Sequence, residues 1–337
     1  MLVGAYSDGT TPGISVYDFN EQIGDFKYLS DIKGVENPSY LVVAPDAQRI
    51  YSVNETADGA VSAFKFDKQT ATLSFLNSQL TNGADPCFIN IDKENTFVVT
   101  ANYSGGNISV FPLNEDGSLQ PVLQVISFND ETKPVHHIHT VVFSPDDSLL
   151  LATDLGADHI YLFKDLKSNK TYKTLNVTPG SGPRHIAFHP TGNYLYTINE
   201  LSGTVAVFSY NNEIQELIQE IASDTTPGIG GKGSADIHIS LNGKFLYASN
   251  RLQADGIAIF SIHPETGQLT NIGYQATGIH PRNFILTPNG KFLLCANRDS
   301  NNIQIFAINS KTGLLQNTGK VIQSDKPVCL KWVDKTY

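Results

Sequence analysis

Short apolar runs bounded by turn residues recur along the whole chain. In the clearest copy, a proline opens an apolar run at 183–188, and a Thr-Gly turn leads to a second run at 194–199 that ends in Asn. A Gly-containing turn then leads to a third run at 203–208 that ends in Phe. The runs are rich in Val, Ile, Tyr, Phe and Thr, which is typical of β-strands. No apolar period of 3.6 residues is sustained, so we expect almost no helix.

This unit is repeated at a regular pitch. Its first turn falls at Pro45, Lys93, Pro145, Pro190, Leu241, Pro288 and Asp334. The mean spacing is about 48 residues, so the 337-residue chain holds about seven units. Each unit has three clear strands and room for a fourth. The pattern predicts an all-β fold, a seven-bladed β-propeller with four-stranded antiparallel blades.

The two ends of the chain complete each other within this repeat. Residues 327–332 match the first strand of a unit, but no second or third strand follows them. Residues 2–6 and 13–17 match a second and a third strand, but no first strand precedes them. We therefore expect the N- and C-terminal strands to close the last blade together, which removes the open sheet edge of a linear array. The prediction is one domain over residues 1–337.

Charge and cysteine content exclude several classes of protein. The chain is 40% hydrophobic with a formal net charge of −10, a poor match for nucleic acid or an anionic membrane surface. No apolar run approaches the roughly 18 residues of a membrane span. Cys87, Cys295 and Cys329 cannot all pair and form no Cys-x-x-Cys, which indicates free thiols in a reducing compartment. The first residues lack the pattern of a signal peptide, so we expect a cytoplasmic protein.

Two positions of the unit carry residues that vary between blades. The first follows the leading proline and is occupied by Ser39, Cys87, His139, Arg184, Ala235, Arg282 and Val328. The second follows the Asn that closes the second strand and is occupied by Glu55, Tyr103, Leu155, Glu200, Arg251, Arg298 and Tyr6. The first two strands form an antiparallel hairpin, so the start of one lies beside the end of the other. Both sets should line one mouth of the propeller channel.

Arginine is concentrated at these positions. The chain has five arginines, and four of them (Arg184, Arg251, Arg282 and Arg298) occupy the two sets. Arginine offers a rigid planar donor fork that suits carboxylate or phosphate. The cluster therefore predicts a site for a small anion. The alternative is a structural ion pair, for instance between Arg184 and Glu200.

Histidine and glutamate supply candidate acid–base groups. His139 and Glu200 are the candidate general acid or base, and Glu55 is a weaker candidate at the equivalent position of another blade. His185, which follows Arg184, and Tyr103 join Arg282, Arg298 and Glu55 as candidate substrate-binding residues. His136 and His139 are not on one helix face, so we predict no metal site and no cofactor. The Gly-rich segment 228–233 lacks P-loop spacing and is interpreted as a flexible loop, with a lid as the alternative.

Several segments resemble the propeller lactonase family, which includes bacterial 6-phosphogluconolactonases of the propeller type and fungal carboxymuconate lactonising enzymes. The matching segments are 98–103, 106–110, 182–185, 199–201, 236–239 and 247–251. The resemblance implies a seven-bladed propeller that acts on a small sugar-acid or dicarboxylate lactone without an obligatory metal. It also implies an active-site group of one His, two Arg and one Glu, matched here by His139, Arg184, Glu200 and Arg251.

The expected activity is hydrolysis of 6-phosphoglucono-δ-lactone, a small anionic sugar lactone. Two alternatives stay open. The first is another enzyme, either another sugar lactonase or an isomerase that opens or closes a muconolactone-like ring, in which the arginines would hold carboxylates. A non-catalytic binding propeller would not need the arginines, but the chain lacks the Gly-His and Trp-Asp signatures of WD repeats, and its one tryptophan is Trp332.

Overall fold

The computed structural model of the protein describes residues 1–129, 135–166, 172–211, 213–225 and 232–333. These residues form strands and no helix, and the strands pair into seven antiparallel sheets of four. The protein is a seven-bladed β-propeller, as the repeat predicted. Within the described ranges, no helix is long and apolar enough to cross a membrane.

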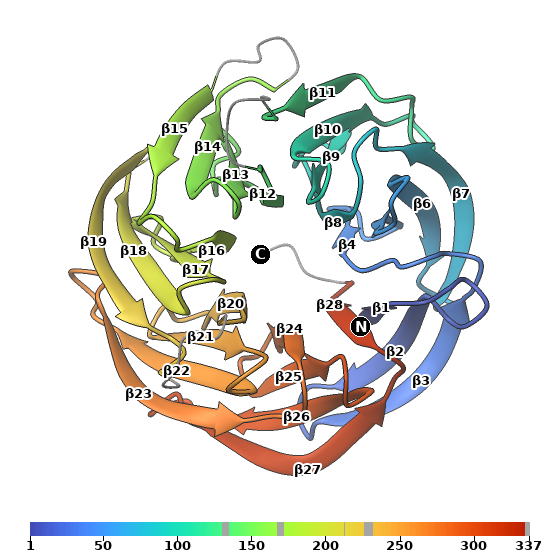
Figure 1. Cartoon of the computed structure of the whole chain (residues 1–337). Helices are drawn as coiled ribbons and strands as arrows, with labels where there is room; N and C mark the ends of the chain where they lie inside the picture. Colours follow the sequence, from blue (N-terminus) through green and yellow to red (C-terminus); the bar gives the residue numbers. More distant parts are fainter. Residues whose placement is uncertain (130–134, 167–171, 212, 226–231, 334–337) are drawn as a thin grey trace. The chain divides into compact units, whose positions relative to one another are not determined.

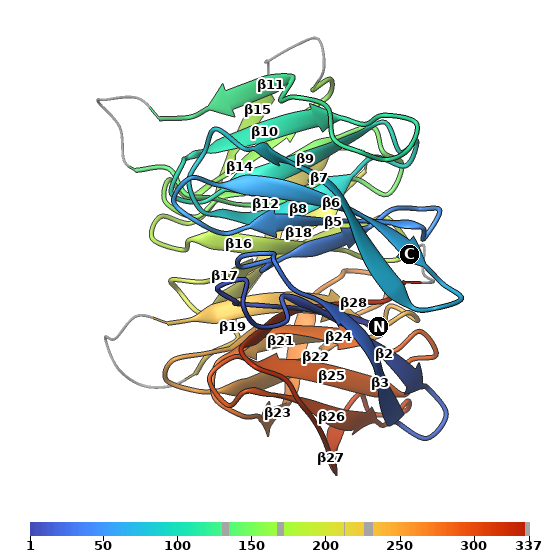
Figure 2. The ribbon, with the colours of Figure 1, turned by 90° about the vertical axis from the view of Figure 1, so that its right-hand side faces the viewer.

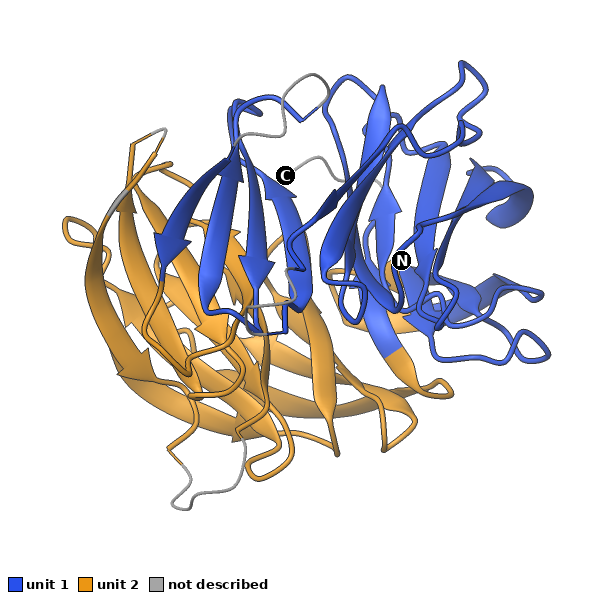
Figure 3. Cartoon of the chain, turned by 45° about the horizontal axis from the view of Figure 1, so that its top comes forward, with its two compact units in different colours: residues 1–18, 27–176, 328–337 blue, residues 19–26, 177–327 orange. Residues whose placement is uncertain are grey.

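The chain forms two compact units (Figure 3). Unit 1 comprises residues 1–18, 27–176 and 328–337, and unit 2 comprises residues 19–26 and 177–327. The complete sheets of unit 1 are β4 (Leu41–Val43), β5 (Arg49–Asn54), β6 (Ala60–Asp67) and β7 (Thr72–Leu80); β8 (Pro86–Ile91), β9 (Phe97–Asn102), β10 (Asn107–Pro112) and β11 (Gln124–Ser127); and β12 (Ile138–Phe143), β13 (Leu150–Asp154), β14 (His159–Phe163) and β15 (Tyr172–Asn176). The sheets of unit 2 are β16 (Pro183–Phe188), β17 (Tyr194–Asn199), β18 (Thr204–Tyr210) and β19 (Ile214–Ala222); β20 (Ser234–Ile239), β21 (Phe245–Asn250), β22 (Gly256–Ile262) and β23 (Leu269–Ala276); and β24 (Pro281–Leu286), β25 (Phe292–Asn297), β26 (Asn302–Ile308) and β27 (Leu315–Gln323).

The seventh sheet is the composite blade predicted from the chain ends. Its strand order is β28 (Pro327–Lys331), β1 (Leu2–Ala5), β2 (Ile14–Asn20) and β3 (Asp25–Ile32). Strand β28 covers the edge that β1 would otherwise expose. Its side chains are buried here, with Val328, Cys329 and Leu330 at most 2% exposed. The closure is therefore both a hydrogen-bonded pairing and an apolar contact.

The second strand of each blade is buried on both faces. In unit 2, Leu246 and Ala248 of β21 pack into a cluster with β17, whereas Phe245 and Tyr247 pack into a cluster with β24 and β25. Successive side chains of a strand point to opposite faces, so β21 is sandwiched between two neighbouring blades. This explains why the second strands are nearly continuous apolar runs. Figure 1 shows β16, β20 and β24 as the inner strands of unit 2 and β19, β23 and β27 as the outer ones.

Tyrosines on second strands bond to the next blade within each unit. The Tyr51 hydroxyl donates to the Gly117 carbonyl over 2.9 Å, Tyr196 donates to Gly267 over 2.8 Å, and Tyr247 donates to Gly313 over 2.9 Å. Each glycine lies in the turn between the third and fourth strands and has a positive φ. Figure 2 shows the ribbon from the side, with β6 and β7, a third and a fourth strand, next to each other. The bonds join adjacent blades of a unit beyond their apolar packing.

Candidate active site

A β-bulge opens the first strand of at least five blades, and it falls on the position that the sequence analysis singled out. In β16, Pro183 pairs with Asn199 and His185 pairs with Ile198, which leaves Arg184 as the extra residue. The same shift in register follows Pro86, Ile138, Ser234 and Pro281. Cys87, His139 and Arg282 are the extra residues in their blades. A bulge redirects a side chain away from the alternation of the strand.

A backbone hydrogen bond holds the second position against the first. The N–H of Glu200 donates to Gly182 over 2.8 Å, that of Arg251 donates to Gly233 over 3.1 Å, and that of Arg298 donates to His280 over 3.0 Å. Each acceptor lies just before the first strand of the same blade. Unit 1 repeats the bond with Glu55, Tyr103 and Leu155 as donors. The two predicted positions therefore lie side by side within each of these blades.

Arg184, Glu200 and Arg251 form the centre of the candidate site in unit 2. Glu200 Oε2 lies 2.8 Å from Arg184 Nε and 3.1 Å from Arg251 Nη2. Both arginines are buried, at 1% and 4% exposure. The Arg184 Nη1 also donates to the Ala235 carbonyl, and Arg251 Nε donates to Gly233 over 2.8 Å. One carboxylate thus joins two blades through guanidinium groups that backbone carbonyls hold in place.

The arginine charges control ionisation at this centre. Burial alone would raise the pKa of Glu200, but the charges of Arg251, Arg184 and Arg282 outweigh burial and hold that pKa below its usual value. Burial and then the repulsion of Arg184 lower the pKa of Arg251 to about 9. At neutral pH, Glu200 is an anion and Arg251 is a cation.

Arg282 and Arg298 extend the positive charge. The Arg282 charge lowers the pKa values of both Glu200 and Arg251. Arg298 forms a two-point ion pair with Asp299, through Nε at 2.7 Å and Nη2 at 3.0 Å. The guanidinium groups of Arg184, Arg251 and Arg298 form ion pairs with two carboxylates, Glu200 and Asp299. Asp236 and Asp255 instead contact the neighbouring histidines, His185 and His280. The guanidinium groups thus outnumber the carboxylates paired with them, which suits an anionic ligand.

His185 lies behind Arg184. Its Nε2 is 3.2 Å from Arg184 Nη1, and its Nδ1 is 2.8 Å from Asp236 Oδ1. Burial and then the Arg184 charge lower the pKa of His185 to about 4. Asp236 is buried as an anion: its pKa lies well below the usual value because His238 and His185 outweigh the cost of burial. The polar contacts of the site therefore continue from Arg184 through His185 to the buried Asp236.

His280 is a site residue that the sequence analysis missed. Its Nε2 lies 3.3 Å from Arg251 Nη1, and its Nδ1 lies 3.4 Å from Asp299 Oδ2. Burial and then the charges of Arg251 and Arg298 lower its pKa to about 3. It precedes Pro281 and has a φ of 62°, a position that blade 182–201 fills with Gly182. The sequence did carry a signal for this residue, because His280 immediately precedes Pro281 and Arg282, where the first of the two variable positions falls.

Unit 1 holds the remaining predicted residues. Tyr103 stacks on His137, with ring centroids 4.3 Å apart, and meets His139 edge to face at 5.7 Å. Glu55 Oε1 accepts a hydrogen bond of 2.9 Å from the Tyr6 hydroxyl, which joins two predicted positions. His139 is 4% exposed. The four predicted catalytic residues are thus divided, with His139 in unit 1 and Arg184, Glu200 and Arg251 in unit 2.

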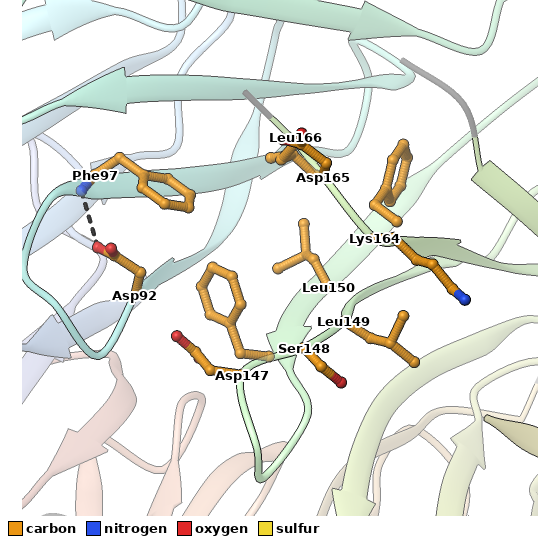
Figure 4. Close-up of a pocket in the computed structure, with 11 residues that line it drawn as sticks. Asp92, Phe97, Asp147, Ser148, Leu149, Leu150, Lys164, Asp165 and Leu166 are labelled. Atoms are coloured by element: carbon orange, nitrogen blue, oxygen red, sulfur yellow. Dashed lines mark hydrogen bonds between the residues drawn. The ribbon is translucent and has the colours of Figure 1, made fainter. Parts of the chain in front are cut away.

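A pocket elsewhere in unit 1 has different chemistry. It has a volume of about 170 Å³ and is lined by Phe97, Phe143, Leu150 and Phe163 among others (Figure 4). It includes Phe143, at the opposite end of β12 from His139. The Asp92 carboxylate at its edge already accepts hydrogen bonds from Thr96 and Phe97. We assign this pocket no catalytic role.

Two further expectations concern ligands and a loop. Among the residues that the structure describes, no group of three or more His, Cys, Asp or Glu side chains is arranged to hold a metal ion. Most of the Gly-rich segment 228–233, interpreted as a loop or lid, lies outside the described residues.

The chain belongs to the family of seven-bladed β-propeller lactonases. The family model described as "Lactonase, 7-bladed beta-propeller" matches residues 1–332. This confirms the resemblance drawn from the motifs around Arg184, Glu200 and Arg251.

Similar proteins have the names of sugar lactonases, most of them 6-phosphogluconolactonases. A 6-phosphogluconolactonase of Formosa agariphila is 39% identical over 94% of both chains, and one of Bacillus subtilis is 36% identical over 98% of this chain and 97% of the other. A solved Bacteroides fragilis structure described as a candidate 6-phosphogluconolactonase is 48% identical, with a TM-score of 0.92 over 99% and 97% of the two chains. The periplasmic gluconolactonase PpgL of Pseudomonas aeruginosa is 31% identical, with a TM-score of 0.90 over 97% and 96% of the chains.

Proposed function

We propose that this protein is a lactone hydrolase that converts 6-phosphoglucono-δ-lactone to 6-phosphogluconate. The observation that carries the proposal is the Glu200 carboxylate held between Arg184 and Arg251, within the arginine cluster. The names of relatives that are 36% and 39% identical over nearly the whole chain support the substrate. Phosphate and carboxylate are the groups that arginine forks bind best.

The reaction needs a base, an oxyanion partner and an acid. The oxygen of water attacks the lactone carbonyl carbon, and a base takes the proton of that water. The carbonyl oxygen becomes an oxyanion, which collapses as the bond from the carbonyl carbon to the ring oxygen breaks. The ring oxygen leaves with a proton from the acid. Stabilising such an oxyanion with a fixed donor commonly contributes about 10²–10³ in rate.

The contacts of Glu200 suit the role of base. Its lowered pKa leaves it ionised at neutral pH, so it can accept a proton from water but holds none to donate. A lactone that opens spontaneously in water needs only a modest base. We assign the acid role to His139, which occupies the bulged position of its own blade and matches the family motif.

The arginines divide between reacting and remote groups of the substrate. We assign Arg184 to the carbonyl oxygen, because its guanidinium is fixed on two sides by Glu200 and the Ala235 carbonyl. Arg251, Arg282 and Arg298 are assigned to the phosphate. Binding energy from a remote phosphate orients the reacting carbonyl.

The direct experiment is hydrolysis of freshly generated 6-phosphogluconolactone, corrected for spontaneous opening, with and without EDTA. We expect fast opening that EDTA does not change. No rate above background would contradict the proposal. A panel with gluconolactone and a muconolactone tests the alternatives, because a preference for the dicarboxylate lactone would indicate an isomerase-type site. A protein that turns over no lactone but binds protein partners after loss of the arginines would be a binding propeller.

We propose the cytoplasm as the site of action, where a phosphorylated sugar lactone would be formed. The three cysteines are buried and form no disulfide bond with one another, which agrees with a reducing compartment. One similar structure is described as periplasmic, so cell fractionation with an antibody to this protein is the test. Recovery in the periplasmic fraction would contradict this location.

A further inference from the structure

Two histidines lie behind the two arginines that hold Glu200, in the same arrangement. His185 Nε2 lies 3.2 Å from Arg184 Nη1, and His280 Nε2 lies 3.3 Å from Arg251 Nη1. On the far side of each ring is a carboxylate: Asp236 faces His185 Nδ1 at 2.8 Å, and Asp299 faces His280 Nδ1 at 3.4 Å. His185 lies within β16 whereas His280 precedes β24, so the two arrangements use different positions of the repeat.

The donors and acceptors specify one form of each ring. A guanidinium N–H can only donate, so the Nε2 that faces it must carry a lone pair. A carboxylate can only accept, so the Nδ1 that faces it must carry the proton. Both histidines are therefore neutral Nδ1–H tautomers. Protonation would place an N–H against an arginine N–H, which agrees with the lowered pKa of both rings.

A neutral hydrogen-bond acceptor can fix the orientation of an arginine side chain without neutralising its charge. Glu200 already neutralises part of the Arg184 and Arg251 charge. A second carboxylate on each guanidinium would neutralise more of the charge that an anionic substrate needs. A histidine instead fixes a second edge of the planar group, and the aspartate behind it fixes the ring.

We propose that Asp236–His185 and Asp299–His280 are positioning pairs that orient the guanidinium groups of Arg184 and Arg251 toward the anionic substrate. The pairs act through the arginines and do not touch the reacting atoms. This proposal rests on the proposed function, because it assigns these arginines to the lactone. It also moves His185 from a substrate contact to a positioning residue.

The tautomers are tested without any substrate. The full-length protein is labelled with ¹⁵N-histidine, and the His185 and His280 signals are assigned from the spectra of His185→Gln and His280→Gln. Long-range ¹H–¹⁵N spectra should show both as neutral Nδ1–H tautomers at pH 7 that remain neutral at pH 5.5. An Nε2–H tautomer, or titration of either ring near its ordinary pKa of about 6.5, would overturn the proposal.

Turnover tests the positioning role. His185→Phe keeps a ring but removes the acceptor for Arg184, whereas His185→Gln can present a neutral acceptor. We expect kcat to fall at least about tenfold in His185→Phe. In His185→Gln, log kcat should lie closer to the parent value than to the value of the Phe variant. The control is His189→Phe, a buried histidine just beyond the other end of β16 that bonds to Thr191 and Gly243, and it should turn over within about twofold of the parent.

The outcomes separate this proposal from the function on which it rests. Equal losses in His185→Phe and His185→Gln with native circular dichroism, or an equal loss in the His189→Phe control, would contradict a positioning role. If His185→Phe does not fold, the tautomer measurement decides. If the parent protein opens no lactone at all, the proposed function fails, whereas the tautomers still decide whether the pairs are built as described.

Discussion

Individual charged residues of the site destabilise the folded protein. Arg184 and Arg251 are buried beside each other's charge, and burial and this repulsion lower the pKa of Arg251. Like charges in a buried cluster oppose folding, and removal of one partner of a buried ion pair commonly costs about 3–5 kcal/mol. An arrangement of this kind is expected where charge serves a ligand rather than stability.

The buried histidines predict a dependence of stability on pH. The unfolded chain binds a proton at each of them near pH 6.5, whereas the folded protein binds it near pH 4 at His185 and near pH 3 at His280. Between the folded and the unfolded pKa of each histidine, the unfolded chain therefore binds more protons than the folded protein. The free energy of unfolding falls as the pH drops below about 6.5. His185 alone should contribute about 1 kcal/mol for each pH unit between about 6 and 4.5, because the two states differ there by slightly less than one bound proton.

Urea unfolding of the parent and of His185→Gln at pH 7, 6, 5 and 4.5 checks this dependence. The variant should show a shallower fall over this range, because it has no proton to bind at position 185. The carboxyl groups of Glu200, Asp236 and Asp299 have lowered pKa values. The stability that they contribute is therefore lost at more acidic pH than the stability that His185 contributes. Parallel curves for the two proteins would contradict the account of His185.

At the scale of elements, the hairpin of the first two strands positions the site. Its turns and its closing Asn were readable from the repeat, so the sequence predicted that Arg184 and Glu200 would lie together. The bulge after the leading proline was not readable, because an extra residue in one strand leaves the apolar pattern of its partner unchanged. His185 was predicted as a site residue but its contact with Asp236 was not, because Asp236 lies 51 residues away. His280 was missed, since its contact with Arg251 joins residues 29 positions apart.

Two glycines at opposite ends of the β16–β17 hairpin test this positioning. Gly182 and Gly192 both have a positive φ, so Ala at either should cost about 1 kcal/mol or more. A Cβ at Gly182 would lie 2.5 Å from Leu201 Cγ, whereas one at Gly192 meets nothing within 4 Å. We expect kcat/KM to fall at least about tenfold in Gly182→Ala, because the corner that carries Arg184 and Glu200 must shift.

Gly192→Ala is the matched control for this experiment. It bears the same backbone strain at the end of the hairpin away from Arg184, so its kcat/KM should stay within about twofold of the parent. Steady-state kinetics at saturating and limiting substrate, with thermal unfolding of both variants, is the measurement. Equal losses of kcat/KM in the two variants would show that general destabilisation, rather than the corner, accounts for the effect.

At the scale of the whole molecule, the repeat pitch and the unmatched strands at the two ends predicted seven blades and their closure. The interblade tyrosine bonds escaped prediction, because the glycine carbonyl that accepts each bond lies 66 or 71 residues from its donor. A regular period determines which strands pair, but single side-chain bonds between blades depend on packing that the period does not specify.

Closure of the composite blade predicts a large loss of stability on truncation. A chain that ends at Ser324 lacks β28 and with it the buried side chains Val328, Cys329 and Leu330. Burial of each such side chain stabilises by about 1.5–3 kcal/mol, so the thermal midpoint should fall by at least about 10 °C, or the protein should not accumulate in soluble form. An unchanged midpoint by scanning calorimetry would contradict a stabilising role for the closure.

The central claim is that the arginine cluster of unit 2 catalyses lactone opening. The most direct test is kcat on 6-phosphogluconolactone for Arg184→Ala, beside Arg49→Ala, which replaces the one arginine outside the predicted positions and leaves Asp46 without its ion pair. With native circular dichroism in both, we predict a loss of at least about 100-fold for Arg184→Ala and a change within about twofold for Arg49→Ala. Near-parental turnover in Arg184→Ala would contradict the account.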